Sequence, residues 1–189
     1  MANNNHLIDK YIDALLVEAA LRKNELNSET ITTVYLGGGT PSLLSITQLS
    51  KLVNGLKKVF DFSDLEEFTI EVNPDDVTAY YIQQAKSLGI NRVSMGVQSF
   101  SDEDLRFINR RHTAKQATDA IHIIKEAGIN NISIDLIYGI PGQNIEIWKN
   151  NVDTAISLSV QHISAYTLMY EEGTRLSVMR SLGNITEVD

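Results

Sequence analysis

The sequence predicts an α/β fold in which parallel β-strands alternate with α-helices and curve into a partial, incomplete TIM-like barrel. The first observation is a repeat: strand-like segments recur roughly every 30 residues with a helical pattern between them, which is the length of a βαβ unit. The second is that polar and apolar residues alternate along the strands. The third is that polar motifs gather where the strands end. The strand-like segments begin near Thr32, Phe68, Arg92, Asn131 and His162.

The composition is that of one globular domain spanning residues 1–189, with 43% hydrophobic residues and enough length to bury a core. The 24 acidic and 16 basic residues give a formal net charge of -8, which disfavours nucleic-acid binding because that requires a dense basic surface. The sequence shows no apolar run of about 20 residues and no signal-peptide pattern, so we expect a cytoplasmic protein without a membrane span. The absence of cysteine excludes thiolate metal ligands and cysteine nucleophiles.

The predicted helices are marked by apolar residues at helical spacing and by caps or stops. Ser45 with Gln48, and Thr113 with Gln116, form capping boxes, because the hydroxyl caps an early amide and the glutamine reaches back. The expected elements are, in chain order, a helix over 7–26, a strand over 32–36, a helix over 45–60, a strand over 67–74, a helix over 76–88, a strand over 92–99, a short helix from 101, a helix over 113–128, a strand over 131–139, a helix over 146–158, a strand over 162–169 and a partial helix within 175–189.

Three successive strands each carry one apolar and one polar face. An ordinary open sheet covered by helices on both sides would be apolar on both faces, whereas a barrel provides a lumen for polar side chains. Unpaired buried carboxylates at Glu71 and Asp135 would cost several kcal/mol, which favours either an internal hydrogen-bond network or a ligand bearing hydroxyls or an ammonium group. The polar faces hold Thr69, Glu71 and Asn73, then Ser94, Gly96 and Gln98, then Ser133 and Asp135.

Two further motifs lie near strand ends. The segment TVYLGGGTPS places three glycines, 37–39, at the edge where parallel α/β folds bind ligands, but it matches neither a Walker A loop nor a dinucleotide fingerprint. The glycines serve either a tight turn or the close approach of a ligand, and the residues alone leave both open. The basic cluster at 110–112 is, by itself, typical of a solvated helix end.

Together these motifs resemble those of a known family. The segments YLGGGTPS, TIEVNPDD, RVSMGVQSF, INRRH and SIDLIYGIPGQ occur in the order and spacing of the radical S-adenosylmethionine (SAM) proteins related to oxygen-independent coproporphyrinogen III oxidase. The resemblance extends from about Asp9 to Thr174. The ending SAYTLMYEEGTRL is more similar to the HemW branch, the haem chaperones, than to the oxidase itself.

The resemblance implies a partial radical SAM barrel that binds SAM across the carboxyl ends of its strands. At matching positions, Glu71 would hold the methionyl ammonium, and Arg110 would pair with the methionyl carboxylate through its guanidinium fork. Gln98 and Asp135 would hydrogen-bond the ribose hydroxyls, and Met169 or its neighbours would line the adenine. The remaining implied contacts are those of the segment that approaches the methionyl part, Gly38, Gly39 and Thr40.

The sequence departs from the family in one respect. Family members hold a [4Fe-4S] cluster with three thiolates of a C-x-x-x-C-x-x-C loop, and this sequence has no cysteine. We therefore expect a truncated piece of a longer protein that lacks the first strand, the cluster loop and the carboxyl-terminal region. We also expect the chain by itself to hold no cluster and to be unable to cleave SAM. The intact protein would act on haem or a porphyrinogen.

Several alternatives remain open from the sequence. The parent is either a HemW-like protein or a true coproporphyrinogen III oxidase, which decarboxylates two propionates. A third reading is a cysteine-free, non-catalytic SAM-binding module, and a fourth is an unrelated α/β barrel enzyme acting on a phosphorylated metabolite. The exposed strand edge at 32–36 also predicts that copies of the chain can dimerise along it.

Overall fold

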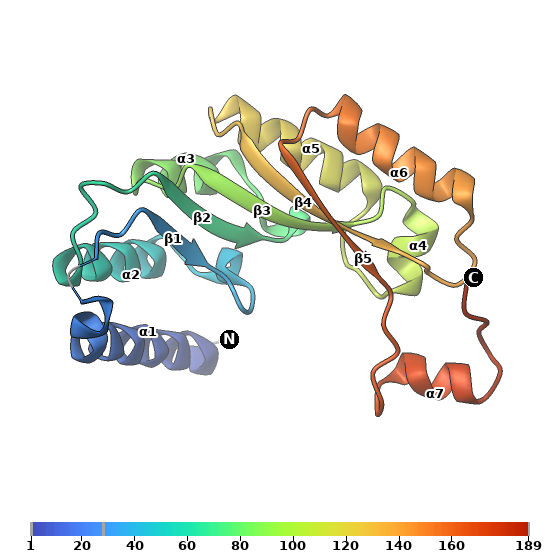
Figure 1. The fold of residues 1–189 in the computed structure, drawn as a ribbon, viewed down its shortest axis with the longest axis horizontal. Coiled ribbons are helices and arrows are strands. Elements are labelled where there is room, and N and C mark those ends of the chain that lie inside the picture. Colours follow the sequence, from blue (N-terminus) through green and yellow to red (C-terminus); the bar gives the residue numbers. More distant parts are fainter. Residues whose placement is uncertain (1, 28, 189) are drawn as a thin grey trace.

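Five parallel strands form one sheet in the order β1-β2-β3-β4-β5 in a computed structural model, which describes residues 2–27 and 29–188 (Figure 1). Consecutive strands lie side by side, and each parallel pair is joined by a segment that contains a helix, as parallel pairing requires. The predicted α/β class and parallel repeat are therefore confirmed. The strands are β1 (Thr33–Leu36), β2 (Glu67–Val72), β3 (Arg92–Gln98), β4 (Asn131–Tyr138) and β5 (His162–Thr167).

The helices form where the spacing predicted them, and both capping boxes are present at Ser45 and Thr113. The first helix differs at both ends: it begins at Ala2 rather than at Leu7, and its predicted last turn is a 3-10 turn that closes at Asn27 in a left-handed conformation. The helix predicted from Asp76 begins at Ala79, because Asp76 belongs to a 3-10 turn. The helices are α1 (Ala2–Arg22), α2 (Ile46–Val59), α3 (Ala79–Ser87), α4 (Asp102–Phe107), α5 (Ala114–Glu126), α6 (Ile145–Ser157) and α7 (Arg175–Ser181), with 3-10 turns η1 (Lys23–Leu26), η2 (Pro41–Leu43) and η3 (Pro74–Asp76).

The alternation along the strands separates the two faces of the sheet. Helices α3, α5 and α6 lie over one face, and the core between them and the sheet is apolar (Figure 1). The strand register places polar residues together on the opposite face, where Glu71 pairs with Ser94 and Ser94 pairs with Ser133. The residues of the apolar face that are fully buried include Phe68, Ile70, Val93, Met95, Ile132 and Ile134.

The sheet does not close into a complete barrel in the part of the chain that the structure describes. Strands β1 and β5 are its two edges, and β1 pairs only with β2. Helix α1 packs against α2 beyond the β1 edge, and α7 lies near the opposite end (Figure 1). The fold is thus a partial TIM-like barrel with one polar concave face. Within residues 2–27 and 29–188, no helix combines the length and apolar content needed to cross a bilayer.

Candidate functional site

A polar cavity of about 240 Å³ lies at the carboxyl ends of the strands. It is lined by six of the eight predicted site residues, which come from segments far apart in the sequence. Gly38 lies beside it, and Met169, which follows the end of β5 and is 66% exposed, is not among its lining residues, so its role stays a prediction. The lining residues are Gly39, Thr40, Glu71, Val72, Asn73, Ser94, Gly96, Gln98, Arg110 and Asp135.

The Glu71 carboxylate is held at both oxygens. The hydroxyl of Tyr35 donates to Oε1 at 2.8 Å, and the backbone N–H of Gly38 donates to Oε2 at 3.1 Å. Burial raises the pKa of the Tyr35 phenol, with Ser94 opposing and Glu71 adding to the rise, so the phenol is protonated and acts as a donor at neutral pH. Sequence reasoning missed Tyr35, although the alternation of β1 places it on the polar face.

The glycines after β1 leave the space in which the Glu71 carboxylate meets the Tyr35 side chain and the Gly38 backbone. A Cβ at Gly37 would lie 2.5 Å from the Tyr35 ring and 2.6 Å from Glu71 Oε1, so only glycine leaves room for the pair. Gly38 has φ +82°, which is strained for other residues, and this conformation accompanies its N–H bond to Glu71. The segment therefore serves the turn and the site together.

Arg110 brings a partly buried cation to the cavity. It follows α4, and its backbone N–H donates to the carbonyl of Leu105 at 2.8 Å, which anchors the turn that carries it. Its Nη2 donates to Gly96 O at 3.3 Å, and in the part of the chain that the structure describes its buried Nε has no hydrogen-bond partner. Burial lowers its pKa, with Asp75 and Asp135 opposing. Arg110 therefore retains donors for an anionic group.

The three adjacent basic residues at 110–112 have different environments. Arg111 Nη2 lies 2.8 Å from Asp75 Oδ2 in an ion pair, and most of its side chain is exposed. His112 is buried, and its Nε2–H donates to Val97 O at 3.0 Å. Burial lowers the pKa of His112, so the ring is neutral at pH 7. Only Arg110 lines the cavity.

Asp135 and Gln98 complete the polar wall. Burial raises the pKa of the Asp135 carboxyl; Ser164 and Arg110 oppose the rise, and Glu71 adds to it. Gln98 has φ +69°, in the left-handed region, and the β3–β4 register shifts between Met95 and Gln98. Such bulges and strained conformations cluster at functional sites because they re-aim a side chain.

A buried hydrogen-bond network supports the end of β3 directly after Gln98. Ser99 Oγ donates to Asp104 Oδ2 at 2.7 Å, and Asn151 accepts from the Phe100 N–H at 2.7 Å. Gln143 Nε2 also donates to Asp104, at 2.8 Å. Sequence reasoning missed this network, since its members come from four separate segments and no motif links them.

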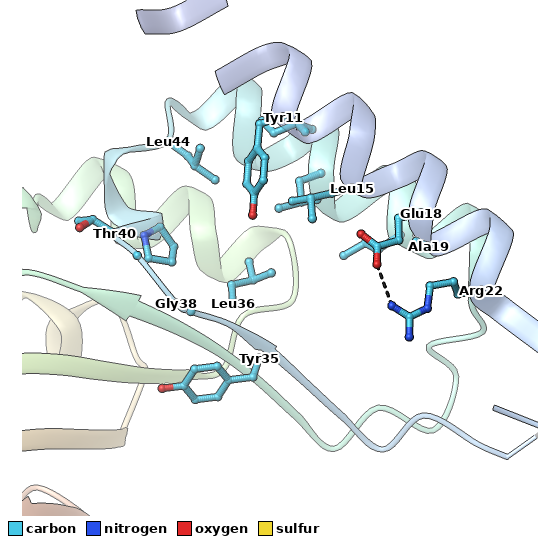
Figure 2. Close-up of a pocket in the computed structure, with 16 residues that line it drawn as sticks. Tyr11, Leu15, Glu18, Ala19, Arg22, Tyr35, Leu36, Gly38, Thr40 and Leu44 are labelled. Atoms are coloured by element: carbon cyan, nitrogen blue, oxygen red, sulfur yellow. Dashed lines mark hydrogen bonds and ion pairs between the residues drawn. The ribbon is translucent and has the colours of Figure 1, made fainter. Parts of the chain in front are cut away.

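A larger groove of about 750 Å³ lies between α1 and β1 and meets the polar cavity at Gly39 and Thr40 (Figure 2). Figure 2 shows that Tyr11 and Leu15 point into the groove, whereas the Tyr35 ring lies on the other side of β1 from Leu36. The groove is mainly apolar and offers little chemistry. It borders the free edge of β1, where the dimer predicted from the sequence would form.

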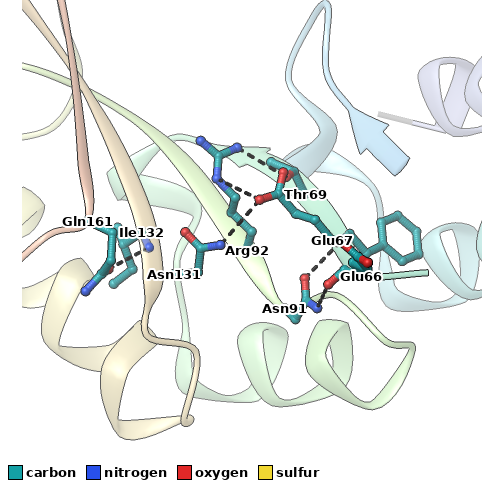
Figure 3. Close-up of polar contacts among 9 residues, drawn as sticks. Glu66, Glu67, Thr69, Asn91, Arg92, Asn131, Ile132 and Gln161 are labelled. Atoms are coloured by element: carbon teal, nitrogen blue, oxygen red, sulfur yellow. Dashed lines mark hydrogen bonds and ion pairs between the residues drawn. The ribbon is translucent and has the colours of Figure 1, made fainter. Parts of the chain in front are cut away.

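At the amino ends of the strands, the side chains of a second polar cluster bond one another (Figure 3). Arg92 Nη1 donates to Thr69 Oγ1 at 3.2 Å and its Nε lies 3.7 Å from Glu67 Oε2. Asn131 Nδ2 also donates to Glu67, at 3.4 Å. This cluster has charges but the residues face one another, so it is not the candidate site.

The carboxyl-end cavity suits one chemical class of ligand. Glu71 offers acceptors to an ammonium, Arg110 offers donors to a carboxylate, and Asp135 and Gln98 can bond hydroxyls. A volume of 240 Å³ is below the roughly 300–1,000 Å³ of most small-molecule pockets. The arrangement therefore fits the zwitterionic and adjoining hydroxyl-bearing part of a larger ligand.

Comparison with known proteins finds relatives over most of the chain. The family described as the Radical SAM superfamily matches residues 7–155. The haem chaperone HemW of Lactococcus lactis subsp. lactis (strain IL1403) is 40% identical over 167 residues, which are 88% of this chain and 43% of that protein. HemW of Bacillus subtilis (strain 168) is 39% identical over 168 residues, which are 88% of this chain and 44% of the relative. The chain thus spans less than half the length of these curated relatives.

Solved structures show the same fold. Coproporphyrinogen III oxidase (HemN) from Escherichia coli, described as a Radical SAM enzyme, has a TM-score of 0.82 at 28% identity, covering 97% of this chain and 42% of that one. The archaeal Elp3 of Methanocaldococcus infernus has a TM-score of 0.72 at 22% identity, covering 91% of this chain and 46% of that one, and shares the fold alone.

Proposed function

Because the chain belongs to the Radical SAM superfamily, we propose that its carboxyl-end cavity binds the methionyl and ribose parts of SAM. One observation carries the proposal: an anchored glutamate and a partly buried arginine, whose Nε has no partner among the described residues, line the same cavity. A free α-amino acid group presents a carboxylate and an ammonium together, and this pair of side chains complements both charges.

Each residue has a role set by its donors and acceptors. Arg110 binds the methionyl carboxylate, and Glu71 binds the ammonium. Asp135 and Gln98 bond the ribose hydroxyls, and the backbone of the glycine segment, Gly38 and Gly39 with Thr40, lies along the methionyl part. We extend the proposal to Met169 beside the adenine, since the segment after β5 continues from the same strand edge.

These residues bind and orient SAM but do not supply its reactivity. In this superfamily a [4Fe-4S] cluster provides the electron that cleaves SAM, and the 189 residues contain no cysteine to hold one. The contribution of this chain is therefore the placement of the amino acid group by Arg110 and Glu71 and of the ribose by Asp135.

For the whole protein we propose a cytoplasmic, HemW-like role in haem delivery, with haem as the partner. The relatives named HemW are up to 40% identical, and this supports the assignment. The second candidate is oxidation of coproporphyrinogen III, which the structural similarity to HemN favours. A protein extending beyond these residues that binds haem stoichiometrically but leaves coproporphyrinogen III unchanged would support the first.

Titration calorimetry with SAM tests the cavity assignment. We expect Arg110→Ala and Asp135→Ala each to weaken binding by about tenfold or more, since a hydrogen bond to a charged group contributes about 1.5–3 kcal/mol. Lys115→Ala, on α5 and in an exposed ion pair with Asp119, is the control for loss of a surface charge and should bind like the wild type. Binding that neither cavity substitution changes would refute the assignment.

A further inference from the structure

Tyr35 holds the Glu71 carboxylate from a neighbouring strand. The register pairs Tyr35 of β1 with Thr69 of β2, which puts its side chain on the polar face two residues from Glu71 along the strand. Its hydroxyl donates to Oε1 at 2.8 Å while Gly38 N–H donates to Oε2 at 3.1 Å. One donor on each oxygen fixes both the plane and the direction of the carboxylate.

The space around the pair is built for this contact. A Cβ at Gly37 would lie 2.5 Å from the Tyr35 ring, 2.6 Å from Glu71 Oε1 and 2.7 Å from Glu71 Cδ. Tyr35 and Glu71 therefore pack against the backbone of the glycine segment itself. Substitution of Gly37 by any larger residue would displace the ring or the carboxylate.

Tyr35 is not a core residue. It is 54% exposed, lies on an edge strand and points away from the apolar face that Leu36 joins (Figure 2). Its hydroxyl therefore contributes little to packing, and in the described part of the chain it donates a hydrogen bond to Glu71. A hydroxyl that donates to a carboxylate facing the ligand cavity affects ligand binding more than it affects packing.

We propose that Tyr35 is a positioning residue that presents Glu71 to the ammonium of an amino acid group and so makes the cavity select ligands bearing that group. A carboxylate oxygen accepts about two hydrogen bonds, so each oxygen of Glu71 retains one acceptor site after bonding Tyr35 or Gly38. A held carboxylate also loses less side-chain freedom when the ligand binds. This inference rests on the proposed binding of SAM and specifies how its amino acid part is recognised.

The test compares two neutral thioethers that differ in the aminocarboxyl group. S-adenosylhomocysteine carries it and methylthioadenosine lacks it. Titration calorimetry of Tyr35→Phe should show roughly two- to tenfold weaker binding of S-adenosylhomocysteine, the loss of one hydrogen bond, with methylthioadenosine within twofold of wild type. Tyr80→Phe, an exposed tyrosine on α3, is the matched control and should change neither.

A double-mutant cycle isolates the route through Glu71. If Tyr35 acts by holding that carboxylate, Tyr35→Phe combined with Glu71→Ala, which removes the acceptor, should bind S-adenosylhomocysteine no more weakly than Glu71→Ala alone. Additive losses of affinity, or equal losses of affinity for both thioethers, would overturn the role of Tyr35. They would leave the proposal that the cavity binds SAM unaffected. A wild-type chain that binds neither thioether nor SAM would instead overturn the proposed function. An unchanged thermal midpoint of Tyr35→Phe shows that the effect is on binding.

Discussion

At the amino ends of the strands Arg92 bonds Thr69 and pairs with Glu67 (Figure 3), whereas at the carboxyl ends Arg110 faces a cavity that it shares with Glu71 and Asp135. Both clusters lie on the same polar face and contain the same kinds of group. At one end the side chains reach one another. At the other the glycine at position 96 and the strand-end loops leave space between them.

The difference shows what distinguishes a structural polar cluster from a binding site. Arg92 has both its partners on the adjacent strand β2, where Thr69 is in register with it and Glu67 lies two residues earlier on the same face. Arg110 comes from a loop, and its buried Nε has no partner in the described chain. It lies beside the carboxyl of Asp135, whose pKa is raised by burial. Unmet hydrogen-bonding capacity, rather than charge itself, marks the site.

Filling the carboxyl-end cavity should remove the difference between the two clusters, and we expect it to have the largest effect of the three changes. In Gly96→Ala, the new Cβ would lie 2.9 Å from Arg110 Nη2 and from Gln98 Nε2 and must displace both. We expect SAM binding to fall by about tenfold or more, as two polar contacts shift. Calorimetry measures this loss, and the thermal midpoint of Gly96→Ala shows whether the fold is retained. Unchanged affinity would contradict the cavity assignment.

Breaking the amino-end cluster should affect stability alone. Thr69→Val keeps the side-chain shape but removes the fully buried Oγ1 that accepts from Arg92 and donates to Glu67. We expect about 1 kcal/mol lower unfolding free energy, equivalent to a thermal midpoint lower by about 2–4 °C. Calorimetric scanning gives the midpoint. SAM affinity should stay within twofold of wild type, and a larger change would mean that the two ends are coupled.

Removing the charge of Asp135 should have the smallest effect, and it should raise the stability of the free protein rather than lower it. Because the folded-state pKa of Asp135 is raised above its ordinary 3.8, ionised Asp135 destabilises the fold at neutral pH, and wild-type stability gains from this group as pH falls through the folded pKa. Asp135→Asn should therefore unfold at higher urea concentration at pH 7, with the advantage shrinking as pH approaches 3.8. Lower stability of the variant at pH 7 would show that the carboxylate is compensated in the free protein.

Much of the architecture could be predicted because its signals are local. The alternation in β2, β3 and β4 separates the two faces, and hydroxyl and glutamine pairs such as Ser45 with Gln48 form the helix caps. Six of the eight predicted site residues line one cavity, since the carboxyl ends of parallel strands meet at one edge. Tyr35 and the Asp104 network were missed, because their partners are distant in sequence and neither forms a recognisable motif.

The sequence by itself determined the strands, their polar face, the family resemblance and the absence of thiolates, since each depends on residue type and on spacing along the chain. Only the tertiary structure decided which polar groups satisfy one another. Arg92 and Arg110 are both arginines close to strands, and the sequence does not separate them. Strand register brings the first to its partners, while a loop and a glycine place the second beside a cavity, where its Nε bonds none of the residues that the structure describes.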